Sequence, residues 1–182
     1  MPLPAPAARE RLHTRAYDFG GYRREDGLWD IEGRMTDAKS YGFDNAYRGR
    51  IEAGEPLHDM WLRLTVDEDL VVRDIEVATE AGPYAVCPAI APNFKRMIGV
   101  KVGRGWRQAV RSRLGGVEGC THLVEMLIAM ATVTFQTLYP VLARKAAKSP
   151  PAGKPGLIDS CHAYRADGEV VKNAWPDHYT GQ

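Results

Sequence analysis

The chain has few cysteines, almost no net charge and no long hydrophobic run. Its three cysteines are an odd number spread over 182 residues, which argues against a disulfide framework and favours free thiols or metal ligands. A formal net charge of +1 creates no field that would attract nucleic acid or an anionic membrane. The longest apolar stretch, residues 123–131, is shorter than the ~20 residues that cross a bilayer.

Several familiar motifs are also missing. There is no Gly-x-Gly-x-x-Gly after a strand, no phosphate-binding loop and no Gly-x-Ser-x-Gly elbow, which disfavours nucleotide binding and serine-hydrolase chemistry. Residues 1–10 are rich in Pro and Ala and do not resemble a signal peptide. The basic stretches 104–113 and 144–154 carry few aromatic residues that could stack on bases. We therefore expect a cytoplasmic protein that binds neither nucleic acid nor membrane.

Length and composition predict one folded domain. A chain of 182 residues with 45% hydrophobic and 26% charged residues is large enough to bury a single core. We expect a disordered N-terminus over residues 1–10 and a single α+β domain over 11–146. A Pro/Gly/Lys linker over 147–156 would lead to a C-terminal segment, 157–182, that docks on the same domain.

The first half of the chain shows the alternating pattern of β-strands. Two hairpins are predicted, one over residues 11–39 with a turn at 25–27, and a stronger one with strands at 60–66 and 70–78. Between them the pattern is lost, so residues 41–56 are predicted as a loop with a short strand near 48–51. These segments favour an antiparallel β-sheet with an extra N-terminal hairpin.

Helical spacing follows from residue 90 onwards. The sequence predicts a helix interrupted by Pro92, a short helix over 106–114, and a long helix over about 121–145 that Thr121 caps and Pro140 bends or ends. Beyond the linker, a short hairpin is expected around residues 167–168. The expected fold is therefore an antiparallel sheet packed on one side by helices, with a C-terminal tail.

The residues most suited to chemistry are cysteines and histidines near element ends. Cys120 and His122 flank the start of the long helix, where free backbone N–H groups stabilise a thiolate. Cys87 precedes the Pro-interrupted helix, and His58 and Asp59 precede a strand whose hairpin would bring them near Cys87. Thiolate, imidazole and carboxylate together suit Zn²⁺ or Fe²⁺. The alternative is that both cysteines are small core residues.

The run Gly-Cys-Thr-His-Leu at 119–123 carries a first resemblance. Together with Trp-Asp-Ile-Glu-Gly at 29–33 and Asp-Ser-Cys-His-Ala-Tyr at 159–164, it resembles a bacterial family of unknown function over nearly the whole chain. Members of that family accompany the catabolism of aromatic compounds, so the resemblance implies a substrate from that chemistry.

Residues 58–143 resemble the NifU/SufE-like fold of iron–sulfur scaffold proteins. A strand hairpin, a cysteine before Ala-Ile-Ala at 89–91, a short helix and a second cysteine before a long helix follow that family's order. The resemblance implies that Cys87 and Cys120 match two of its three ligand cysteines. Asp59 lies near its Cys-Gly-Asp segment, but the cysteine of that segment is absent. A mononuclear site remains, in which His122 or His58 replaces sulfur.

Three functions are consistent with these patterns. The first is a metal-dependent lyase or hydrolase with one Zn or Fe per chain, acting on a small carbonyl or aromatic-catabolism substrate. The expected ligands are Cys87, Cys120, His122 and His58, and the expected proton-transfer groups are Asp59 and Glu125. The second is a sulfur or iron–sulfur carrier that uses Cys120 and docks a partner protein. The third is a metal-free binding domain. Whether the chain forms a homo-oligomer stays open.

Overall fold

The computed structural model describes residues 3–148 and 153–182. The chain divides into two compact units, residues 1–139 and residues 140–182. The first unit contains the sheet and most of the helices, and the second contains the end of the long helix and the C-terminal segment. Each unit is described by itself.

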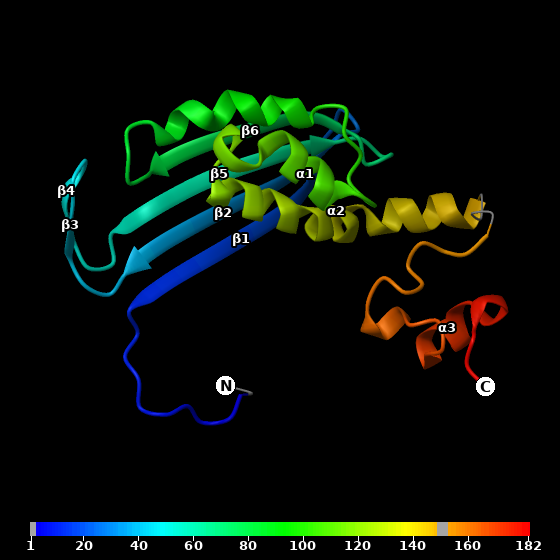
Figure 1. Ribbon diagram of the computed structural model, residues 1–182. Helices are drawn as coiled ribbons and strands as arrows, with labels where there is room; N and C mark the ends of the chain where they lie inside the picture. Colours follow the sequence, from blue (N-terminus) through cyan, green and yellow to red (C-terminus); the bar gives the residue numbers. More distant parts are fainter. Residues whose placement is uncertain (1–2, 149–152) are drawn as a thin grey trace. The chain divides into compact units, whose positions relative to one another are not determined.

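A four-stranded antiparallel sheet forms the centre of the first unit (Figure 1). Its strands lie in the order β1-β2-β5-β6, and each pairs with its neighbour along nearly its full length. The predicted N-terminal hairpin is thus part of the main sheet. The α+β class with an antiparallel sheet is confirmed. The strand bounds are β1 His13–Arg23, β2 Trp29–Lys39, β5 Pro56–Val66 and β6 Val72–Ala81.

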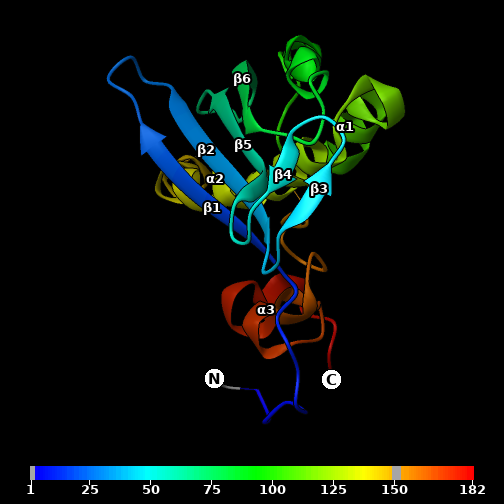
Figure 2. The same cartoon turned by 90° about the vertical axis from the view of Figure 1, so that its left-hand side faces the viewer.

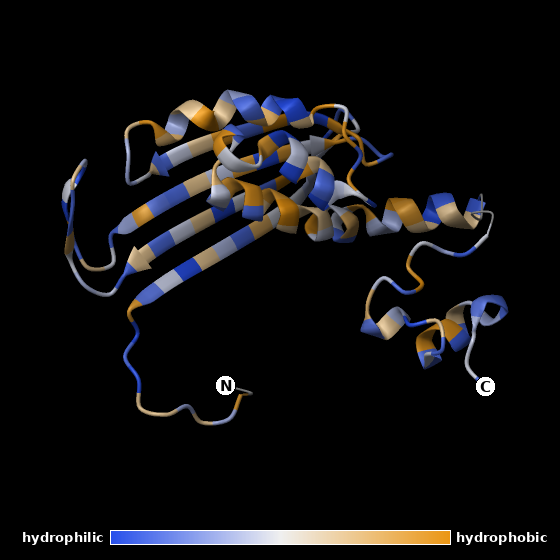
Figure 3. Ribbon diagram, in the orientation of Figure 1, coloured by the Kyte–Doolittle hydropathy of each residue, from blue (hydrophilic) through white to orange (hydrophobic). Residues whose placement is uncertain are grey.

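The two faces of this sheet differ in polarity, because successive side chains point to opposite sides. Hydrophobic and hydrophilic residues alternate along the strands in Figure 3. One face is buried, and β2 and β5 supply most of its apolar residues, namely Trp29, Ile31, Met35, Met60, Leu62, Leu64 and Val66. On the other face Arg63 bridges Glu32 at 2.7 Å and Glu76 at 2.9 Å. The charged face is open to solvent, as the alternation predicts.

Helices cover the apolar face (Figure 2). They are the 3₁₀ helices η1 Cys87–Met97 and η2 Gly116–Glu118 and the α-helices α1 Trp106–Leu114 and α2 Thr121–Lys148. Segment 87–97 is 3₁₀ rather than α, and Pro92 inside it lacks the N–H group that would donate an α-helical hydrogen bond. Thr121 is the first helical residue rather than the cap, and Pro140 lies inside α2 without ending it.

The long helix α2 packs one stripe of side chains on the sheet. That stripe is fully buried and consists of Leu123, Met126, Leu127, Met130, Thr134 and Leu138. By length and composition alone, this 28-residue helix would also suffice to cross a membrane. In this fold its apolar stripe packs on the sheet, and 33% of its most apolar 18-residue segment is buried. The cytoplasmic location stays a prediction.

Two short segments differ from expectation. The predicted loop 41–56 contains a small antiparallel ribbon of β3 Phe43–Asn45 and β4 Gly49–Ile51. The hairpin predicted around residues 167–168 is wrong. The C-terminal segment instead forms η3 His162–Tyr164, α3 Glu169–Ala174 and η4 Pro176–His178.

The domain boundaries predicted from composition stay predictions. Residues 3–12 form no regular secondary structure, and disorder of the N-terminus stays a prediction. Of the expected linker 147–156, residues 149–152 lie outside the described residues. Docking of segment 157–182 on the main domain also stays a prediction.

Candidate metal centre

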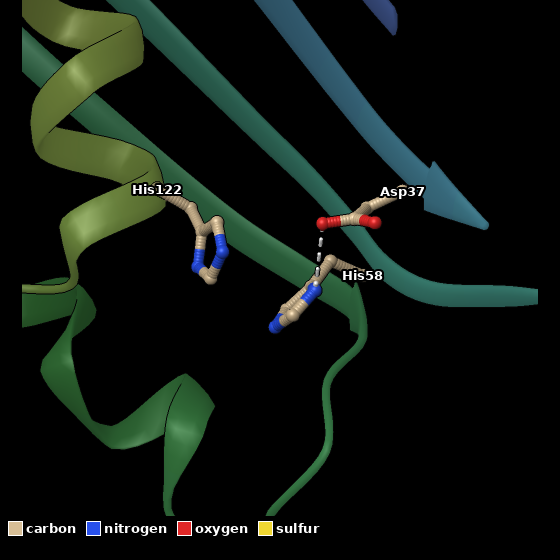
Figure 4. A group of neighbouring side chains, drawn as sticks. All are labelled: Asp37, His58 and His122. Atoms are coloured by element: carbon tan, nitrogen blue, oxygen red, sulfur yellow. Dashed lines mark ion pairs between the residues drawn. The ribbon is translucent and has the colours of Figure 1, made fainter. Parts of the chain in front are cut away.

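Three polar side chains from three elements meet at one end of the sheet. Asp37 lies near the end of β2, His58 near the start of β5, and His122 in the first turn of α2 (Figure 4). One ligand atom of each lies within 4.8 Å of the others. Among residues 3–148 and 153–182, this is the one group of three or more His, Cys, Asp or Glu side chains gathered so closely.

Strand register places the first two of these residues side by side. Asp37 and His58 are direct cross-strand partners of β2 and β5, so their side chains lie on the same face of the sheet. Both lie on the buried face of their strands, and Asp37 is only 4% and His58 only 7% exposed. The ring of His122 approaches from the helix, with its centroid 4.0 Å from that of His58. The cluster is therefore a polar end of the apolar core.

Asp37 is held by two neighbours from β1, Arg15 and His13. Arg15 donates from Nη2 and Nε to the Oδ2 atom of Asp37, at 2.5 and 3.2 Å, and His13 Nε2 contacts Oδ1. Burial raises the pKa of Asp37, but the hydrogen bonds from Arg15 and His13 outweigh it and the pKa is lowered. Asp37 is therefore a fixed, ionised carboxylate at neutral pH.

His58 carries a buried nitrogen without a hydrogen bond. Its Nδ1 lies 3.4 Å from Oδ2 of Asp37, but this contact lacks hydrogen-bond geometry, and no other partner is present among the described residues. Burial and the neighbouring His122 lower the pKa of His58. Burial and Arg15 lower the pKa of His122. Both imidazoles are therefore neutral at neutral pH, the form that binds metal ions.

Two further predicted residues lie at the margin of the cluster. The Sγ atom of Cys120 lies 3.7 Å from Nδ1 of His122, because Cys120 directly precedes α2 and its carbonyl accepts the first hydrogen bond of that helix. Glu125 is mostly exposed and lies 3.8 Å from Arg15. The site thus has the thiol of Cys120 and the exposed carboxylate of Glu125 at its margin.

Other predicted site residues lie elsewhere. Cys87 is the first residue of η1 and lies next to Gly82. A Cβ atom added at Gly82 would lie 3.4 Å from Sγ of Cys87. Asp59 points to the opposite face of β5 from His58 and pairs with Arg34 at 2.7 Å. The structure brings neither of them into the group with His58 and His122.

Sequence reasoning missed Asp37 and the residues that hold it, His13 and Arg15. A signal was present, because alternation from Trp29 through Met35 assigns position 37 to the buried face. A carboxylate at a core position requires a partner or a metal ion. The burial pattern of β2 therefore predicts Asp37 as a candidate metal ligand.

Residues 13–136 match a family model described as "Protein of unknown function (DUF2889)". The chain belongs to this family. The DUF2889 region contains Asp37, His58 and His122 together with Arg15 and Cys120, and it ends within α2. No curated protein and no solved structure matches the chain. The resemblance to a family of unknown function is confirmed, and the NifU/SufE-like fold stays a prediction.

Proposed function

We propose that this DUF2889 protein is a mononuclear metal protein in which Asp37, His58 and His122 hold one Zn or Fe ion. The observation that carries the proposal is the buried, unbonded Nδ1 of His58 beside an ionised carboxylate and a second imidazole. A buried polar atom without a partner is costly. A metal ion would satisfy that nitrogen.

The ligand types agree with this proposal. Two imidazoles and one carboxylate form a common ligand set of catalytic Zn²⁺ and of non-haem Fe²⁺. Ligating carboxylates are usually held by further hydrogen bonds, which orient them. Arg15 and His13 do this for Asp37. Since a carboxylate oxygen has more than one lone pair, the bonds of Asp37 leave it able to bind a cation.

The proposed reaction class follows from the number of ligands. Three protein ligands leave a coordination position open, where a metal ion polarises a carbonyl group or lowers the pKa of a bound water. Glu125 is linked to Asp37 through Arg15 and is exposed enough to move a proton. We propose a lyase or hydrolase acting on a small carbonyl compound, with aromatic-catabolism substrates as the first set to screen.

Elemental analysis of protein purified anaerobically without chelators tests the proposal. We expect about one Zn or Fe ion per chain, and a loss of most of the metal in Asp37→Asn, His58→Ala and His122→Ala. His162→Ala is the matched control, because His162 is exposed and lies in the C-terminal unit. Circular dichroism of each variant separates loss of ligand from loss of fold. Metal-free wild-type protein, or full metal content in all three folded variants, would overturn the proposal.

A sulfur carrier is the second candidate, and the contact between Cys120 and His122 favours it. An imidazole beside a thiol can accept its proton and activate the sulfur. Cys120→Ser in the same experiment separates the two functions. Under the metal function this variant keeps its metal, because the ligand set does not include Cys120. Under the carrier function the wild-type protein holds no metal, and only Cys120→Ser loses the ability to accept the outer sulfur of a small-molecule persulfide, whose thiolate leaves.

A further inference from the structure

A groove lies between α1 and α2, and no residue of the metal centre lines it. Its volume is about 790 Å³. The indole Nε1 of Trp106 donates a buried hydrogen bond to the carbonyl of Leu127 at 3.1 Å, which fixes the two helices against each other. Helix α1 lines the groove with Arg107, Gln108, Arg111 and Ser112, and α2 lines it with Ile128 and Ala131.

One wall of this groove is cationic and has no acidic partner. Arg107 and Arg111 are four residues apart on α1, so they lie side by side on the helix surface, where like charges repel. Within the described part of the chain, no carboxylate pairs with either of them, and neither α1 nor the groove lining contains an acidic residue. Some arginines elsewhere do have carboxylate partners, namely Arg15, Arg24, Arg34, Arg48, Arg50, Arg63, Arg73, Arg96 and Arg165.

The opposite wall is apolar. Ile128 and Ala131 are one turn apart on α2 and remain half-exposed. Phe135 extends this stripe by one more turn and is 39% exposed. Its ring lies near Gly103, where an added Cβ would come within 3.9 Å of it. Apolar side chains left accessible beside unpaired arginines complement a molecule with an anionic end and an apolar body.

We propose that this groove binds a small oxyanion, carboxylate or phosphate, carried on an apolar body. The guanidinium groups of Arg107 and Arg111 hold the oxyanion, since their planar donors match both groups. The side-chain amide of Gln108 supplies a further donor, and Ile128 and Ala131 cover the apolar body. The groove volume falls within the ~300–1,000 Å³ of small-molecule sites. This site is separate from the proposed metal centre and does not depend on it.

Calorimetric titration of the full chain tests the proposal with three probes of equal chain length: octanoate, octyl phosphate and octanol. At least one anion is expected to bind saturably, and octanol at least about tenfold more weakly, because it lacks the charge-assisted bonds. The stronger of the two anions identifies the natural head group as carboxylate or phosphate. An Arg107→Gln/Arg111→Gln variant is expected to bind both anions only as weakly as octanol.

A matched control is Arg9→Gln/Arg11→Gln, which removes the same charge from the exposed N-terminal segment and is expected to bind like the wild type. The metal content of both double variants is expected to be unchanged, which separates this proposal from the metal centre. The proposal is overturned if neither anion binds saturably, if octanol binds as well as the anions, or if both double variants lose affinity equally.

Discussion

At the scale of single residues, Asp67 organises the turn between β5 and β6. Its carboxylate accepts hydrogen bonds from the backbone amides of Asp69 and Val71, both at 2.9 Å, and from Nε of Arg73 at 2.7 Å. The turn contains Leu70 at a φ of 65°, a conformation that a non-glycine residue adopts only with support from its surroundings. Burial raises the pKa of Asp67, but these hydrogen bonds outweigh it and lower the pKa.

The lowered pKa gives a stability prediction with a definite sign. A folded-state pKa below the unfolded value of about 3.9 means that the ionised carboxylate stabilises the fold above that pH. This contribution is lost as the pH falls through the folded-state pKa. We expect Asp67→Asn to unfold more easily in urea by about 1–2 kcal/mol at neutral pH, and the difference from wild type to shrink on acidification. Asp44→Asn is the control, since Asp44 is 86% exposed. A difference that is constant with pH would contradict the role of the charge.

Only part of the candidate site could be predicted from the sequence. Imidazoles are rare in this chain, so His58 and His122 could be chosen directly from the sequence. Asp37 is one of 23 acidic residues, and only strand register places it opposite His58. Cys87 and Cys120 were expected to meet because each precedes a helix. A position before a helix does not determine where that helix start lies in space.

At the scale of elements, Gly21 determines how closely α2 approaches the sheet. A Cβ at Gly21 of β1 would lie 1.9 Å from Oγ1 and 2.8 Å from Cβ of Thr137 in α2. Neither distance is compatible with van der Waals radii, and Thr137 Oγ1 is held by a hydrogen bond to the carbonyl of Val133. The helix contacts β1 directly because this position has no side chain.

Gly21→Ala should therefore force α2 away from β1. We expect a loss of about 1–3 kcal/mol in the free energy of unfolding, as for other overpacked positions, measured by urea titration. Gly20→Ala is the matched control, because a Cβ at Gly20 meets only the end of the movable Tyr22 side chain, at 2.7 Å from its hydroxyl oxygen. Equal destabilisation by the two substitutions would show that the loss comes from the strand and not from its contact with α2.

Strands and helices were predicted correctly where the sequence pattern extends over enough residues to distinguish the two. The alternation from Met60 to Val66 predicted a strand, and the glycines on either side of residues 106–114 predicted both bounds of α1. The C-terminal hairpin was wrong because its few apolar residues have no period of two. Val170 and Val171 are adjacent, and only Val171 is buried. The segment forms the short helix α3, in which Val171 is the buried residue.

At the scale of the whole molecule, the proposed centre lies entirely within one of the two compact units. The ligands Asp37, His58 and His122 and the supporting residues His13 and Arg15 all precede residue 140. So does every side chain of the buried stripe of α2. Within residues 153–182, the buried apolar residues are Ile158 and Val171.

This division predicts the effect of removing residues 149–182. A chain that ends at Lys148 retains all of α2 and is expected to keep its metal content. Its melting temperature should fall by no more than about 2–4 °C, the shift that corresponds to ~1 kcal/mol in a chain of this size. Elemental analysis and thermal denaturation followed by circular dichroism measure both quantities. If the truncated chain loses its metal or melts much earlier, the C-terminal segment completes the main domain, as its predicted docking requires. If both are retained, the centre and its fold do not require residues 149–182.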